Sequence, residues 1–216
     1  MTERPPAGQY CDIPLATLPT ARPPSRRAAS GAPQVGLTPQ SLYQSHFAFV
    51  WRNLRRLGVP EGVLEDAAQD VFIVVHRRWD SYDADWSAVE PWLFGILLRV
   101  ARSHRRSWWR RLKVFALPEE RAVEGTCPAS HRTDPGMAAE RRERVELLER
   151  VLGRLSPTKR AVFVMVELEE LSVPQAAESL GLNLNTVYSR LRVARADFER
   201  ALEEERREAT REGAHG

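Results

Sequence analysis

Cysteine is scarce in this sequence, and its two copies, Cys11 and Cys127, lie far apart. No C-x-x-C pair or Cys/His cluster is present, so the ligand spacing of a zinc site is missing. A chain with two isolated thiols suits a reducing compartment. The sequence therefore predicts no metal site and a cytoplasmic location.

Long hydrophobic runs are absent as well. No apolar stretch approaches the ~20 residues that cross a bilayer, and prolines and arginines interrupt the N-terminus where a signal peptide needs a continuous apolar core. Catalytic patterns are also missing: the five histidines lie apart, with no P-loop, nucleophile elbow or metal-ligand spacing. We expect no membrane insertion, no cofactor, no catalytic residue and no enzyme.

The charge that is present is unevenly distributed. The formal net charge is only +3, but arginines crowd residues 99–111 and 190–195, whereas acidic residues gather at 65–70 and 203–208. Basic clusters attract phosphate groups, and acidic clusters do not. The pattern indicates a nucleic-acid surface and a separate protein-binding surface.

Apolar residues recur at helical spacings of three and four, and no strand alternation is found. This predicts an all-α fold with two small helical domains joined by a flexible linker, the C-terminal one a helix-turn-helix. The N-terminal residues are rich in proline and arginine and cannot build a core. The predicted segments are a disordered tail at 1–38, a helical domain at 39–112, a linker at 113–136, a second helical domain at 137–205 and a charged tail at 206–216.

Three helices are predicted in the first domain. Gly58 and Pro60 end the first helix, and the second runs from about residue 61 to residue 79. The third begins near Ser87 or Pro91, with a capping box at Ser87-x-x-Glu90, and runs to about residue 109. The predicted inward residues are Tyr43, Phe47, Val50, Leu54 and Leu57 in the first helix, Leu64, Ala67, Val71, Val74 and Val75 in the second, and Val89, Leu93, Ile96 and Val100 in the third.

The second domain is predicted to open with a helix that buries Val145, Leu148, Leu152 and Leu155. Ser156 and Pro157 then form a cap and a first-turn proline, which start a helix that runs to about residue 169. The remaining helices form a helix-turn-helix.

Local signals mark each part of that helix-turn-helix. Ser172-x-x-Gln175 is a capping box that opens a short helix over 173–180. Gly181 can adopt the positive φ that the turn requires, and Asn183 caps a long last helix. The predicted inward residues of the last helix are Val187, Leu191, Ala194, Phe198 and Leu202.

The outward face of the last helix carries hydrogen-bonding side chains and no carboxylate, which suits an approach to DNA. A solvated helix of an ordinary bundle is the alternative interpretation. The side chains assigned to base edges are Leu184, Asn185, Tyr188, Ser189 and Arg192. Those assigned to phosphates are Thr186, Arg190 and Arg195.

The helix over 61–79 has a polar arc opposite its buried arc, formed by Glu65, Asp66, Gln69, Asp70 and Arg77. Ile73 falls in the middle of this arc and Phe72 lies at its margin. An apolar centre with a polar rim is typical of a protein-binding face. The alternative is that another helix covers the arc.

The next helix carries an arginine stripe, because Arg99, Arg102, Arg106 and Arg110 recur three or four residues apart. The aromatic residues Trp79, Tyr82 and Trp86 precede it. Arginines beside aromatic rings favour single-stranded nucleic acid, on which every base can stack. A charged helix with aromatic core residues is the alternative.

Four stretches resemble the two-domain sigma factors of bacterial RNA polymerase, of the extracytoplasmic-function group. Asp66-Ala-Ala-Gln69-Asp70-Val71-Phe72 resembles the D-x-x-Q-[DE]-x-F motif of the second sigma region. Trp92-Leu93-Phe94, followed by Ile96, resembles the helix that reads melted promoter DNA. Leu155-Ser156-Pro157-x-x-Arg160-x-Val162-Phe163 and the helix-turn-helix from Ala176 to Arg195 resemble the fourth region.

This resemblance implies a function in transcription initiation. The set Asp66, Gln69, Asp70, Phe72 and Ile73 is then expected to bind core RNA polymerase. The set Trp79, Tyr82, Trp86, Arg99, Arg102 and Arg106 is expected to bind and melt the −10 element, and the last helix to read the −35 element. Promoter DNA and core polymerase are the expected partners, with an anti-sigma protein as a further one. A stand-alone helix-turn-helix regulator is the alternative function.

Overall fold

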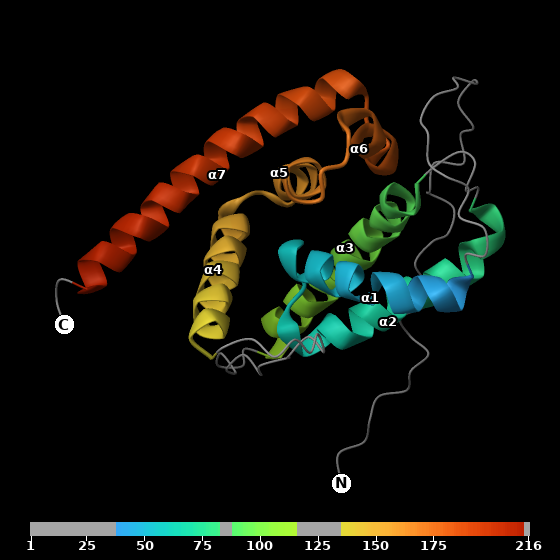
Figure 1. Cartoon of the computed structure of the whole chain (residues 1–216), viewed down its shortest axis with the longest axis horizontal. Helices are drawn as coiled ribbons and strands as arrows, with labels where there is room; N and C mark the ends of the chain where they lie inside the picture. Colours follow the sequence, from blue (N-terminus) through green and yellow to red (C-terminus); the bar gives the residue numbers. More distant parts are fainter. Residues whose placement is uncertain (1–37, 83–87, 116–134, 214–216) are drawn as a thin grey trace, which may run out of the picture. The chain divides into compact units, whose positions relative to one another are not determined.

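The computed structural model describes residues 38–82, 88–115 and 135–213, and within these ranges the chain is helical, without strands. Figure 1 shows the order of the helices along the chain. They are α1 (Pro39–Arg56), the 3₁₀ helix η2 (Glu61–Val63), α2 (Leu64–Arg78), the 3₁₀ helix η3 (Trp79–Ser81), α3 (Val89–Phe115), α4 (Pro135–Arg154), α5 (Pro157–Phe163), the π-helix η4 (Val164–Leu168), α6 (Val173–Leu180) and α7 (Leu184–Gly213).

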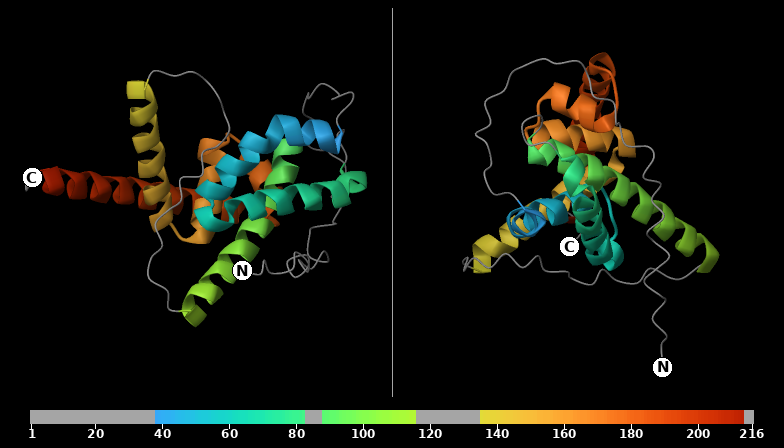
Figure 2. Two further views of the ribbon diagram at one scale, coloured as in Figure 1. Left: turned by 90° about the horizontal axis from the view of Figure 1, so that it is seen from below. Right: turned by 90° about the vertical axis from the view of Figure 1, so that its right-hand side faces the viewer.

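Helices α1, α2 and α3 pack against one another (Figures 1 and 2). Thr38 opens α1 with a capping box, because its side chain accepts a hydrogen bond from the backbone N–H of Ser41. After α1 the chain turns at Gly58, whose φ of 79° favours glycine. Each buried core side chain contributes about 1.5–3 kcal/mol by leaving water. Fully buried members of this core are Val50, Leu54, Val71, Val75, Leu93 and Leu97.

Helices α4 to α7 form a second packed group, in which α7 contacts α4, α5 and α6. The predicted caps of the helix-turn-helix are confirmed. Ser172 and Gln175 form the capping box of α6, and Gly181 ends α6 with a φ of 64°. The Asn183 side chain accepts the backbone N–H of Thr186 at 2.7 Å and so caps α7.

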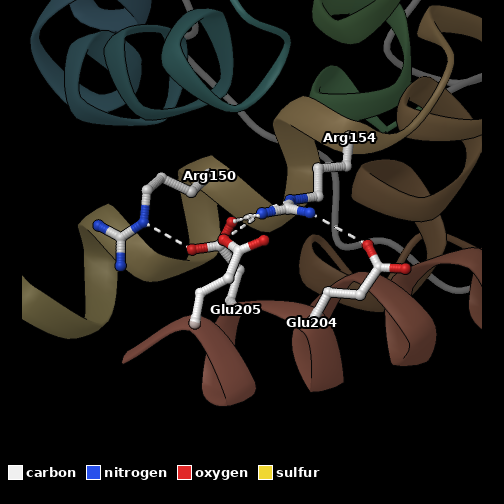
Figure 3. Close-up of polar contacts among 5 residues, drawn as sticks. Arg150, Arg154, Glu204 and Glu205 are labelled. Carbon is white, nitrogen blue, oxygen red and sulfur yellow. Dashed lines mark hydrogen bonds and ion pairs between the residues drawn. The ribbon is translucent and has the colours of Figure 1, made fainter. Parts of the chain in front are cut away.

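Arginines of α4 bind acidic residues in the C-terminal half of α7 (Figure 3). Arg150 donates to Glu205 at 2.9 Å, and Arg154 lies between Glu204, at 3.0 Å, and Glu205, at 2.6 Å. Arg154 also pairs with Glu208 at 2.8 Å. These ion pairs join the C-terminal end of α4 to the C-terminal half of α7.

Polar contacts also connect the two groups of helices. The Ser179 hydroxyl of α6 donates to the Pro91 carbonyl of α3 at 2.9 Å. Arg52 and Arg56 of α1 both pair with Glu169, which follows η4. Helix α6 therefore lies against the beginning of α3.

The α2 prediction was too long at both ends. The N–H of Val63 donates to the Pro60 carbonyl three residues back, at 3.1 Å, so the chain starts as a 3₁₀ turn and becomes α-helical only at Leu64. Residues 79–81 form a second 3₁₀ turn. The proposed cap at Ser87 lies outside the described residues.

Helices extend past the predicted borders of the linker and of the C-terminal charged tail. Helix α3 continues to Phe115 and α4 already begins at Pro135. Helix α7 continues to Gly213, so residues 206–213 of the predicted charged tail are part of this helix. Side-chain pairs along this stretch, such as Arg207 with Glu203, support the extra turns.

The helix that starts at Pro157 also differs from the prediction. Ser156 precedes it but makes no side-chain capping bond. The α-helix ends at Phe163 and continues as a π-helix, in which the N–H of Glu169 donates to the Val164 carbonyl five residues back.

Two residues predicted to face inward are exposed. Tyr43 is 47% exposed and Val145 is 40% exposed. Val145 belongs to the stretch 139–146 of α4, all of which is exposed, because the contact with α7 starts further along the helix. Within the described ranges, no helix combines the length and the apolar character needed to cross a membrane.

Candidate functional site

The N-terminal half of α7 presents a polar and partly apolar exposed face. Asn185, Ser189 and Arg192 are exposed, and so are Leu184 (46%) and Tyr188 (57%). This agrees with the outward face predicted from sequence. Thr186 and Arg190 are half-buried at its edge. The face offers donors, acceptors and an apolar spot for a thymine methyl group, which are the groups that read base edges.

Arg195, predicted to bind phosphate, is exposed but already has a partner. Its guanidinium donates to Glu167 of η4 at 2.6 Å and 3.0 Å. A phosphate must therefore compete with this carboxylate or share the guanidinium with it. Sequence reasoning missed Glu167, which lies 28 positions before Arg195.

Three aromatic rings gather where η3 meets the start of α3. The ring centroids of Tyr82 and Trp92 lie 4.9 Å apart, those of Trp79 and Tyr82 5.6 Å apart, and those of Trp79 and Trp92 6.4 Å apart. All three residues are half-buried. Trp86 lies outside the described residues.

An aromatic-to-arginine line runs along one face of α3. Trp92, Arg99 and Arg106 recur every seven residues, about two helical turns, so they share a face. Arg102 and Arg106 are exposed and Arg99 is half-buried. Burial lowers the pKa of Arg99, and the nearby charges of Arg78 and Arg102 lower it further. Positive charge is therefore concentrated beside the aromatic group, as an anionic strand requires.

The predicted partner face of α2 divides into two parts. Asp66 and Gln69 are exposed. Phe72 and Ile73 are half-buried, and the Phe72 ring packs edge-on against Tyr43 of α1, with centroids 4.7 Å apart. Phe72, predicted at the margin of the arc, is therefore partly covered by α1, and Ile73 is only partly exposed.

Asp70 is the remaining residue assigned to that face, and its side chain is partly buried against α3. Its carboxylate Oδ2 lies 2.8 Å from Nε2 of His104 on α3. The His104 side chain is 7% exposed and that of Asp70 is 19% exposed. Asp70 thus joins the polar surface of α2 to the buried side of α3.

Two residues that contact these sites, Trp92 and His104, were not assigned to them from the sequence. Trp92 could have been assigned, since it lies at the start of the arginine-bearing helix. Nothing in the sequence pointed to His104, because an isolated histidine on a helix is common. Among the described residues, no group of three or more His, Cys, Asp or Glu side chains could hold a metal ion.

Comparison with known families matches both groups of helices. Residues 42–111 match the family described as Sigma-70 region 2. Residues 145–198 match the family described as Sigma-70, region 4. The first match spans the helices α1 to α3, and the second spans the helix-turn-helix and its supporting helices.

Individual relatives agree with these matches. The chain is 33% identical to RNA polymerase sigma factor NccH of Alcaligenes xylosoxydans xylosoxydans, over 80% of this chain and 89% of NccH. It is 30% identical to RNA polymerase sigma factor CnrH of Cupriavidus metallidurans, over 75% and 85% of the two chains. A solved structure of CnrH with the cytosolic domain of CnrY matches with a TM-score of 0.55 and 26% identity, over 77% of this chain and 88% of CnrH. The chain therefore belongs to the extracytoplasmic-function group of sigma factors, which direct RNA polymerase to promoters.

Proposed function

We propose that α2 binds core RNA polymerase and that the start of α7 reads the −35 element. The rings of Trp79, Tyr82 and Trp92, together with the arginines of α3, are proposed to bind the −10 element. The observation that carries this division is the line Trp92, Arg99 and Arg106, which supplies stacking and positive charge on one face. It lies on a different helix from the exposed face of α7.

Promoter melting by this surface needs no catalytic residue. Taking a base out of the duplex costs a few kcal/mol, and stacking on an aromatic side chain returns about 1–3 kcal/mol per base. The rings of Trp79, Tyr82 and Trp92 are the candidates for that stacking. In this proposal the polymerase performs nucleotidyl transfer, the chain is not an enzyme, and it acts in the cytoplasm where the polymerase works.

The start of α7 would set the register on the upstream element. Arg192 is assigned to base edges and Arg195 to a phosphate, so their loss should differ. We expect Arg192→Ala to change the preference among −35 sequences and Arg195→Ala to weaken binding to all of them. Equal losses on every sequence for both variants would remove the base-reading role of Arg192.

Asp66 is the best probe of the polymerase face, because its carboxylate is exposed. Asp66→Arg should weaken co-purification with core polymerase and leave the thermal melt unchanged. Asp70→Arg is a poorer probe, since it also removes the contact of the Asp70 carboxylate with buried His104. Unchanged co-purification of Asp66→Arg would show that the face is misassigned.

A protein that inhibits this sigma factor is a further expected partner, because the relative CnrH was solved with the cytosolic domain of CnrY. The decisive experiment for the function is multi-round transcription from genomic DNA with core polymerase, with and without the chain. New start sites that share two upstream elements are the expected result. Tight duplex binding without any effect on the polymerase would instead support a stand-alone regulator.

A further inference from the structure

We propose that His104 is a positioning residue of the polymerase-binding face: it holds the Asp70 carboxylate in place from the buried side of α3. This inference rests on the proposed function, since Asp70 belongs to the face assigned to the polymerase. The contact that carries it joins Nε2 of His104 to Oδ2 of Asp70 at 2.8 Å.

His104 occupies an apolar environment. Leu97, Val100 and Ala101 on the same side of α3 are buried, and His104 itself is 6% exposed. It is the only buried polar residue of α3 among the side chains that the structure describes. A hydrophobic residue would fill such a position without needing a partner, whereas a buried imidazole must find one. Asp70 meets that need across the α2–α3 contact.

The position of His104 on α3 decides which side of that helix is joined to Asp70. At about 100° per residue, His104 lies on the opposite side of α3 from the stripe of Arg99, Arg102 and Arg106. The bond to Asp70 therefore joins α2 to the side of α3 that faces away from the stripe. The same bond limits the rotamers of Asp70, so its carboxylate is already ordered before a partner arrives.

The expected loss of polymerase affinity in a His104 variant equals the entropic cost of ordering the Asp70 side chain on binding. Without His104, polymerase binding must itself immobilise the Asp70 side chain, which corresponds to about a threefold to tenfold loss of affinity. His104→Gln keeps an amide N–H near the position of Nε2 and should retain affinity within about twofold. His104→Ala removes the donor and should show the full loss.

The test is the dissociation constant of labelled full-length chain and core RNA polymerase, measured for His104→Ala, His104→Gln, Asp70→Ala and the Asp70→Ala/His104→Ala double variant. If His104 acts through Asp70, His104→Ala adds less than about twofold in the Asp70→Ala background. An equal loss in both backgrounds overturns the proposal, and so does unchanged affinity of either single alanine variant. If His104→Ala does not fold, His104→Met replaces it, since methionine keeps the volume without the donor.

Asp66→Arg serves as the matched control, because it lies on the same face and does not touch His104. A loss with Asp66→Arg but not with His104→Ala overturns only the positioning role. No loss with Asp66→Arg means that the polymerase-binding face itself is wrongly assigned, which is a failure of the proposed function.

Discussion

Arg195 of α7 and Glu167 of η4 form an ion pair with two hydrogen bonds: Nη2 and Nε of the guanidinium lie 2.6 Å and 3.0 Å from the same carboxylate oxygen. The carboxylate is placed beside a residue assigned to a DNA phosphate. A negative charge there opposes the approach of the backbone. We therefore expect the pair to limit the strength of DNA binding if Arg195 contacts a phosphate as proposed, while it joins η4 to α7.

We expect Glu167→Gln to tighten binding to −35 duplex DNA by a few-fold at low salt, because Arg195 no longer shares its charge with a carboxylate. The plot of log K against log salt should steepen by up to about one unit. Fluorescence anisotropy at several salt concentrations measures both. Glu203→Gln is the control, since it removes an equal charge at the far end of α7. Equal tightening by both variants would point to net charge alone.

A substitution at Gly181 tests the left-handed backbone of the turn without disturbing side-chain packing. Its φ is +64°, and a Cβ placed there would meet no atom within 4 Å. Gly181→Ala should therefore cost only backbone strain, about 1–2 kcal/mol of unfolding free energy. Gly181→Asn should cost less, since asparagine tolerates this region.

Urea unfolding measures the cost at Gly181, and Gly62→Ala is its control. A Cβ at Gly62 would meet Trp108 at 3.6 Å, an ordinary contact, so we expect a change within about 0.5 kcal/mol. A Gly181→Ala variant as stable as the parent would contradict the left-handed assignment.

Trp92 should contribute to binding of single-stranded −10 DNA. Trp92→Ala should weaken binding of the polymerase complex to a forked promoter probe by about 1–3 kcal/mol, the value of one stacked base. Trp92→Phe keeps a smaller ring and should recover part of this. Binding to fully duplex −35 DNA should stay unchanged for both variants, and a parallel loss there would indicate a folding defect.

Acid should release the C-terminal half of α7 from α4. Hydrogen bonds from Arg150, and then from Arg154, lower the pKa of Glu205 below its ordinary value of 4.5. A depressed carboxyl pKa contributes stability above the unfolded pKa, and that stability is lost as the pH falls through the folded pKa. We expect amide exchange over residues 200–211 to rise below about pH 4.5.

Glu205→Gln separates this effect from general acid unfolding. Its amide exchange in the same segment should already be faster at pH 7 and should depend less on acid. A parent chain whose α7 end exchanges equally at pH 7 and pH 3.5, normalised for intrinsic rates, would exclude the ion-pair contribution.

Much of the molecule follows from local sequence. The capping box of Ser172 and Gln175, the left-handed turn at Gly181 and the cap at Asn183 each depend on residues within a few positions of one another. The exposed face of α7 follows from helical periodicity in the same way. Short-range geometry is nearly independent of the rest of the fold, so these features could be predicted.

Tertiary packing alone decided the partners of the charged and aromatic groups. Asp70 meets His104 across 34 positions and Arg195 meets Glu167 across 28, and Trp79 meets Trp92 only where η3 returns to α3. Periodicity states which side of a helix a residue lies on, but not which neighbouring helix covers that side. That choice depends on how apolar surfaces pack, so the sequence by itself determined the main helices, the caps of the helix-turn-helix and the family, and packing determined which side chains act together.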